Sequence, residues 1–162
     1  MTVFSESQRF ALWVYVLAIA VTCIGLGAIF LAENTAGAKT VPPAIALGIA
    51  AMLLFLWDVL WLRTSVDGSG LFVCLGRPVP IMWKRIPLEA IHEVRVVTYR
   101  PILDAGGWGM RFGRFEGRFT IFWNARGDRG VLIDTDARRF VIGSQSPEEL
   151  LTAIKRVRGR LT

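Results

Sequence analysis

The sequence predicts an α+β membrane protein: a two-helix transmembrane hairpin precedes a bent antiparallel β-sheet that a C-terminal amphipathic helix caps. Residues 10–32 carry no charge, and residues 41–62 carry only Asp58. About 20 apolar helical residues cross the roughly 30 Å hydrocarbon core of a bilayer, so both runs are long enough to span it. After residue 62, short alternating segments and glycine-rich turns replace the apolar runs, which is typical of strands.

The two apolar runs set the expected divisions of the chain. We expect an N-terminal segment at 1–9, transmembrane helices at 10–32 and 41–62, an external loop at 33–40, and one domain at 63–162. Lysine and arginine are more frequent in loops on the cytoplasmic side. The loop at 33–40 contains only Lys39, whereas Arg9 precedes the first run and Arg63 follows the second. Both termini are therefore predicted to be cytoplasmic.

Seven segments of the C-terminal domain have the alternation and the bounding turns of strands. Within one of them, Phe119, Ile121 and Trp123 share a face. The predicted strands are residues 71–75, 79–83, 91–98, 108–115, 118–123, 131–134 and 139–143. Seven short strands in this order favour a small, strongly bent sheet or barrel with an open end.

The sequence marks the start of the last helix. Ser146 is the expected N-cap, Pro147 the first helical residue, and Glu149 completes a capping box. Leu150 and Ile154 share one apolar face. We expect this face to cover the open end of the sheet.

Three segments carry a resemblance to a known family: AGGWGMR at 105–111, GVLI at 130–133 and RFVIG at 139–143. With the preceding apolar runs, they resemble bacterial membrane-anchored proteins in which two spanning helices precede a pleckstrin-homology-like domain. The resemblance extends over essentially the whole chain. It implies a pleckstrin-homology-like fold and a multi-pass location in the bacterial cytoplasmic (inner) membrane, and it implies no activity.

The C-terminal domain is basic, with 17 Lys and Arg against 10 Asp and Glu over residues 63–162, a net charge of +7. A basic domain beside a membrane favours anionic lipid as a partner. No nucleic-acid-binding motif is present, so we expect no nucleic-acid partner. The residues predicted to form a lipid- or partner-binding face are Arg77, Lys84, Arg85, Arg111, Arg114, Arg118, Lys155, Arg156, Arg158 and Arg160. Scattered solubilising charges are the alternative interpretation.

Two further features have a structural and a functional interpretation. In the motif Gly106, Gly107, Trp108 and Gly109, the glycines permit positive φ and redirect a strand, or the loop displays Trp108 to a ligand. We favour the first. Asp58 is the only charge within an apolar run, and carboxylates inside membranes are candidates for function. Its place near the end of the run favours instead a structural pair with Arg9.

No catalytic arrangement is recognisable. The single histidine, His92, has no neighbouring metal-ligand residues, and no glycine loop precedes a Lys-Ser or Lys-Thr pair. We therefore predict no catalytic residues, metal or cofactor. The sequence favours a non-enzymatic membrane protein whose cytoplasmic module binds a protein partner or anionic lipid. The alternatives are an accessory subunit of a membrane complex recognised through the hairpin, a homo-oligomer, and an enzyme of the membrane surface.

Overall fold

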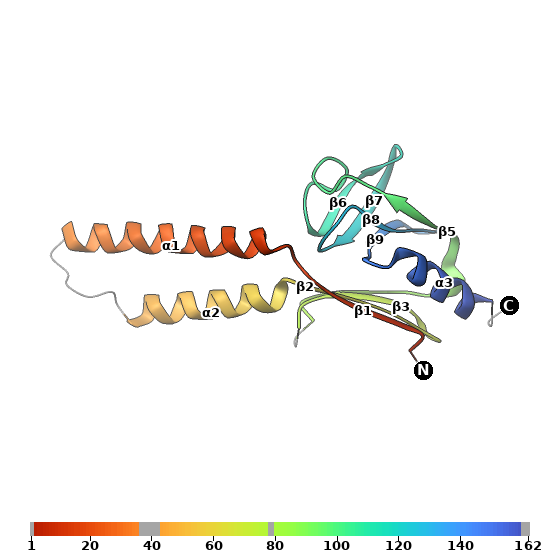
Figure 1. Ribbon diagram of the computed structural model, residues 1–162, viewed down its shortest axis with the longest axis horizontal. Coiled ribbons are helices and arrows are strands. Elements are labelled where there is room, and N and C mark those ends of the chain that lie inside the picture. The colour runs from red at the N-terminus through yellow and green to blue at the C-terminus, as the bar shows by residue number, and fades with distance from the viewer. Residues whose placement is uncertain (1, 36–42, 78–79, 160–162) are drawn as a thin grey trace. The chain divides into compact units, whose positions relative to one another are not determined.

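The computed structural model describes residues 2–35, 43–77 and 80–159 (Figure 1). The chain forms two compact units. A β-sheet unit combines Met1–Phe10 with Val59–Thr162, and a helical unit consists of Ala11–Asp58. The helical unit is therefore inserted within the β-sheet unit. Residues 1–9, for which the sequence predicted no element, supply its first strand.

In the β-sheet unit, the described residues form nine strands and one α-helix. The strands are β1 (Phe4–Arg9), β2 (Trp61–Asp67), β3 (Gly70–Leu75), β4 (Met82–Ile86), β5 (Ile91–Thr98), β6 (Gly109–Phe115), β7 (Arg118–Asn124), β8 (Arg129–Thr135) and β9 (Arg139–Gly143). A 3-10 turn, Leu88–Ala90, precedes β5, and α3 (Pro147–Arg158) follows β9. The helical unit contains α1 (Leu12–Thr35) and α2 (Pro43–Val59).

The strands form two sheets, which corrects the predicted seven-stranded bent sheet or barrel. The first sheet has the order β1-β2-β3-β4 and the second β5-β8-β9-β7-β6. All neighbours are antiparallel except β7 and β9, which are parallel. The 3-10 turn Leu88–Ala90 separates β4 from β5, so the chain leaves the first sheet there and begins the second. Alternation identifies a strand but not its partner, which is why the sequence did not distinguish one sheet from two.

The predicted membrane spans also need correction. Over the parts of the chain that the structure describes, no helix combines the length and the apolar character needed to cross a bilayer. The last residues of the second apolar run belong to a strand and not to a helix, because α2 ends at Val59 and β2 begins at Trp61. The 17 residues of α2 rise only about 25 Å. The transmembrane hairpin and the multi-pass inner-membrane localisation derived from it are contradicted by this finding.

β1 links the two sheets of the β-sheet unit. It pairs with β2 throughout its length, and its buried Gln8 donates a hydrogen bond from Nε2 to the carbonyl oxygen of Gly143, 2.9 Å away. The Glu6 carboxylate accepts hydrogen bonds from the Ser144 hydroxyl (2.5 Å) and the Gln145 amide (2.7 Å). The N-terminal strand thus fixes the connection between β9 and α3.

α3 packs against strands of both sheets, including β1, β2, β5 and β8. It begins at Pro147, and the side chains of Leu150 and Ile154 are fully buried. Ser146 is the N-cap residue, but its side chain makes no capping hydrogen bond, which corrects the predicted capping box. Its amide donates instead to the Ser144 hydroxyl, 3.1 Å away. The hydroxyl that orders this helix start therefore comes from residue 144.

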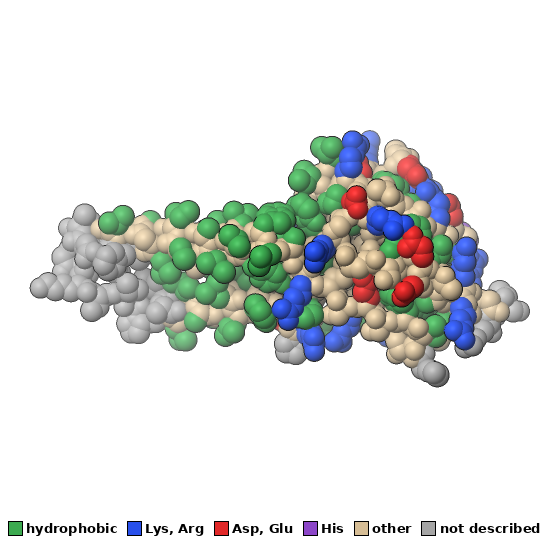
Figure 2. Space-filling view, viewed as in Figure 1, with side chains coloured by type: hydrophobic (Ala, Val, Ile, Leu, Met, Phe, Trp, Pro, Cys, Tyr) green, Lys and Arg blue, Asp and Glu red, His purple; other side chains and the backbone are tan. Residues whose placement is uncertain are grey.

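In the helical unit, α1 and α2 lie side by side (Figure 1). The rings of Tyr15, near the start of α1, and Trp57, near the end of α2, have centroids 6.0 Å apart. Large apolar side chains cover the outward surface, with Leu12 78% exposed and Leu54 72% exposed (Figure 2). A helix that is apolar on all sides is normally covered by other apolar groups.

Candidate functional site: an apolar cleft and its aromatic rim

The β-sheet unit has an apolar cleft of about 380 Å³ between β4 and the β6-β7-β9 end of the second sheet. β4 and β6 are the last strands of their respective sheets. The cleft therefore lies where the two sheets end. The lining residues are Ile81, Met82, Trp83, Lys84, Met110, Phe112, Ile121, Trp123, Arg138 and Phe140.

The register of the strands explains why so many apolar side chains meet here. Phe112 on β6 is directly opposite Ile121 on β7, and Ile121 is paired with Phe140 on β9. Met110 is likewise opposite Trp123. Because side chains alternate between the faces of a sheet, these five project from the same face. Three adjacent strands thus form one apolar wall of the cleft.

Exposed aromatic rings continue this wall onto the surface. Phe112 and Phe119 are 58% and 62% exposed, and their stacked rings have centroids 6.0 Å apart with an interplanar angle of 14°. On the other side of the cleft, Trp83 is 62% exposed and stacks on Phe72 at 6.3 Å. Adjoining exposed apolar side chains of this kind mark interaction sites.

The charges of the cleft have a single sign. Lys84 and Arg138 are its only charged residues among those described, and neither forms an ion pair with another described residue. A second hollow of about 600 Å³ adjoins the cleft and shares Phe112 and Arg138 with it. In this hollow the Arg118 guanidinium lies 2.5 Å from the Asp134 carboxylate. The two hollows therefore differ, since only the second contains acidic groups.

An ion network fixes the hairpin that carries the aromatic rim. The Arg139 side chain is only 6% exposed, lies 2.8 Å from the Glu116 carboxylate and donates to the carbonyl oxygen of Phe115. Arg95 also binds Glu116, at 2.5 Å. Hydrogen bonds from Arg95 and then from Arg139 lower the pKa of Glu116. The tip of the β6-β7 hairpin is thus held to β5 and β9.

The predicted basic residues come from three parts of the β-sheet unit: Arg77, Lys84 and Arg85 at β3-β4, Arg111, Arg114 and Arg118 on β6-β7, and Lys155, Arg156 and Arg158 on α3. Arg160 lies outside the described residues. Basic and acidic side chains are interspersed on the visible face of the β-sheet unit (Figure 2).

Several of these cations have partners of their own. The guanidinium of Arg77 lies over the Trp61 ring at 5.1 Å, and that of Arg85 over Phe72 at 5.6 Å. Arg85 also donates to the Ser69 hydroxyl, 2.6 Å away. Within the described ranges, the cations without an acidic partner include Lys84, Arg111, Arg114, Lys155, Arg156 and Arg158.

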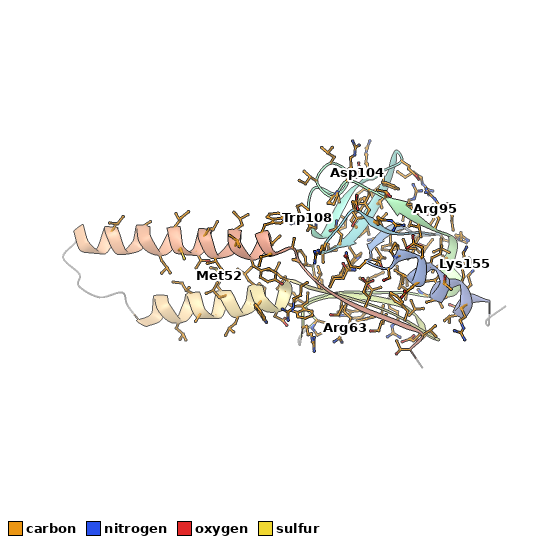
Figure 3. All side chains as sticks on the ribbon, in the orientation of Figure 1. Met52, Arg63, Arg95, Asp104, Trp108 and Lys155 are labelled. Carbon is orange, nitrogen blue, oxygen red and sulfur yellow. The ribbon has the colours of Figure 1, made fainter. Side chains whose placement is uncertain are left out.

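The glycine-tryptophan motif leads the chain into β6. Gly106, Gly107 and Gly109 have φ angles of 74°, 126° and 99°, which favour glycine. The Gly107 carbonyl accepts a hydrogen bond from the Asn124 amide, 3.3 Å away. Trp108 is half-buried in the loop ahead of β6 (Figure 3). The glycines therefore have a conformational role in starting an edge strand of the cleft.

The other singled-out residues are not among those that line the cleft. The Arg9 guanidinium lies over the Trp61 ring at 4.5 Å. Asp58 belongs to the helical unit, and its Oδ1 is buried without a hydrogen-bond partner among the described residues. The Arg9–Asp58 pair stays a prediction. His92 is exposed and lies 2.5 Å from the exposed Asp136 carboxylate.

No group of three His, Cys, Asp or Glu side chains within the described ranges is placed to hold a metal ion. The chain matches no family model, no curated protein and no solved structure. The resemblance to pleckstrin-homology-like proteins therefore stays a prediction.

Proposed function

We propose that the β-sheet unit is a non-enzymatic binding module for anionic lipid headgroups, and that the β6-β7 hairpin is its contact surface. The observation that carries the proposal is the stacked, exposed pair Phe112 and Phe119 beside Arg114. Arg114 is directly opposite Phe119 in the β-ladder, so both project from the same face. Aromatic rings and cations together suit a surface with an apolar interior and negative headgroups.

The positive charge of the domain favours an anionic lipid over an uncharged binding partner. Residues 63–162 have a net charge of +7. Each basic residue near an anionic lipid surface contributes about 1 kcal/mol. Arg114 has no acidic partner among the described residues, so binding would break no ion pair there. An acidic protein surface could bind the same cations. This alternative is favoured if the chain shows no preference for anionic lipid.

The test measures binding of the full chain to vesicles of neutral and of mixed neutral and anionic phospholipid. We expect stronger binding to the anionic vesicles, weakened by salt because screening shortens the range of the attraction. Arg114→Gln should lower that affinity about fivefold, from one contribution of about 1 kcal/mol.

The matched control is Lys155→Gln, which removes one exposed cation from α3. This control should bind anionic vesicles like the unmodified chain. The apolar helices are common to all variants, so differences between them report the cations. Equal binding to neutral and anionic vesicles would contradict the proposal and favour a protein partner.

The helical unit favours a second candidate function, assembly with apolar helices of a partner or of a second copy. The supporting observation is the exposure of large apolar side chains on both helices, including Ile24 and Leu54, each 72% exposed. Gly48 and Ala51 are exposed small residues on α2. Small residues allow the backbone of a second helix to approach closely.

Gly48→Leu tests this second function. A Cβ added at Gly48 meets no atom within 4 Å, so the helical unit should tolerate the substitution. If α2 packs on another helix through this face, the variant should lose assembly, measured as a smaller mass in light scattering coupled to gel filtration. Gly25→Leu on α1, where an added Cβ also meets nothing, is the control. An unchanged mass for Gly48→Leu would exclude this face as the assembly surface.

A further inference from the structure

We propose that the cleft between β4 and the β6-β7-β9 wall binds one single-chain anionic amphiphile, with its hydrocarbon chain inside and its acid group at Lys84 and Arg138. This ligand is a monomeric molecule, and the proposal goes beyond headgroup binding at the β6-β7 surface. It does not depend on that function, since different cations carry each.

The shape and lining of the cleft suit a hydrocarbon chain. Its volume of about 380 Å³ lies within the range of small-molecule sites in proteins. Eight of its ten lining residues are apolar or aromatic. Each buried methylene should strengthen binding about fourfold. Affinity should therefore rise with chain length until the cleft is filled.

The charged groups of the lining select the sign of the ligand. On β4, Lys84 alternates with Trp83 and Arg85 and shares its face with the buried Ile86, which turns Lys84 toward the space between the sheets. Arg138 comes from the turn between β8 and β9, across the cleft from β4. No acidic residue is among the described lining residues. An anion therefore gains from both cations and is repelled by no lining carboxylate.

Calorimetric titration of the full chain tests the proposal, with dodecanoate and dodecyl phosphate below their micelle concentrations and dodecanol below its solubility limit. We expect at least one of the two anions to bind about tenfold or more tightly than dodecanol, and the better anion identifies the acid group. Lys84→Gln with Arg138→Gln should remove this preference and leave dodecanol binding unchanged. Lys155→Gln on α3 is the charge-matched control and should change nothing.

A photoreactive diazirine analogue of dodecanoate locates the bound chain. Labelling should fall on residues 80–84 and 110–123, and Met110→Trp should abolish it by filling the cleft. Because Lys84 and Arg138 are exposed, their glutamine variants should fold even if Met110→Trp does not. Equal affinity for the anions and dodecanol, labelling confined to residues 11–58, or unchanged anion binding by the glutamine variants would overturn the proposal.

Discussion

At the scale of single residues, Tyr99 shows how burial changes the pKa of a side chain. The side chain is 1% exposed, and its ring packs against Phe122 with centroids 5.6 Å apart. Burial raises the pKa of Tyr99 to about 12. The folded protein therefore holds the phenolic proton more tightly than the unfolded chain does.

Tyr99→Phe tests this consequence. A raised pKa contributes stability that is complete below the ordinary tyrosine value of 10 and is lost as pH rises through about 12. A shift of two units corresponds to about 2.7 kcal/mol. Urea unfolding between pH 9 and about pH 12 should therefore give a smaller loss of unfolding free energy for Tyr99→Phe than for the unmodified chain. Parallel pH profiles of the two proteins would contradict this.

At the scale of elements, β1 is the strand that the sequence did not predict. Its sequence, FSESQR, is almost entirely polar and has no apolar alternation. The strand is stabilised by pairing with β2 and by the hydrogen bonds of Glu6 and Gln8 to residues near position 144. Such long-range contacts leave no local signal. β2 was missed for another reason, because Trp61 and Leu62 continue the preceding apolar run.

Gln8→Ala tests whether β1 belongs to the β-sheet unit. Gln8 is 5% exposed, and its amide donates to the Gly143 carbonyl at 2.9 Å. The substitution should lower the free energy of unfolding by about 1–3 kcal/mol, because it leaves a buried carbonyl oxygen unpaired. Urea denaturation measures the change. Ser7→Ala, at the adjacent exposed position, should change stability by at most about 0.5 kcal/mol. Equal stabilities of the two variants would exclude the linking role of Gln8.

One wall of the cleft could be predicted from local sequence patterns, and the opposite wall could not. The alternation of Phe119, Ile121 and Trp123 predicted that their side chains share one face of a strand. The strand register places them on one face, and Ile121 and Trp123 both line the cleft. The opposite wall, with Lys84, lies on β4 in the other sheet. Its position depends on how two sheets pack, which no alternation pattern specifies.

At the scale of the whole molecule, the chain separates a charged β-sheet unit from an apolar helical unit. β1 and β2 pair from Phe4 and Val66 to Arg9 and Trp61, and the helical unit is inserted at the end of this ladder. The sequence located both apolar helices because an apolar run is a local property. It placed their ends incorrectly, since Leu62 is apolar and yet belongs to a strand.

The central claim is that the β6-β7 hairpin contacts anionic lipid, and hydrogen–deuterium exchange of the full chain tests it directly. The exchange rates of backbone amides are measured in the presence of neutral vesicles and in the presence of anionic vesicles, and the two sets of rates are compared. We expect that anionic vesicles alone slow exchange over residues 109–119, around Phe112 and Arg114, and leave the exchange of α3 unchanged. Equal exchange of residues 109–119 with both vesicles, or protection confined to α3, would contradict it.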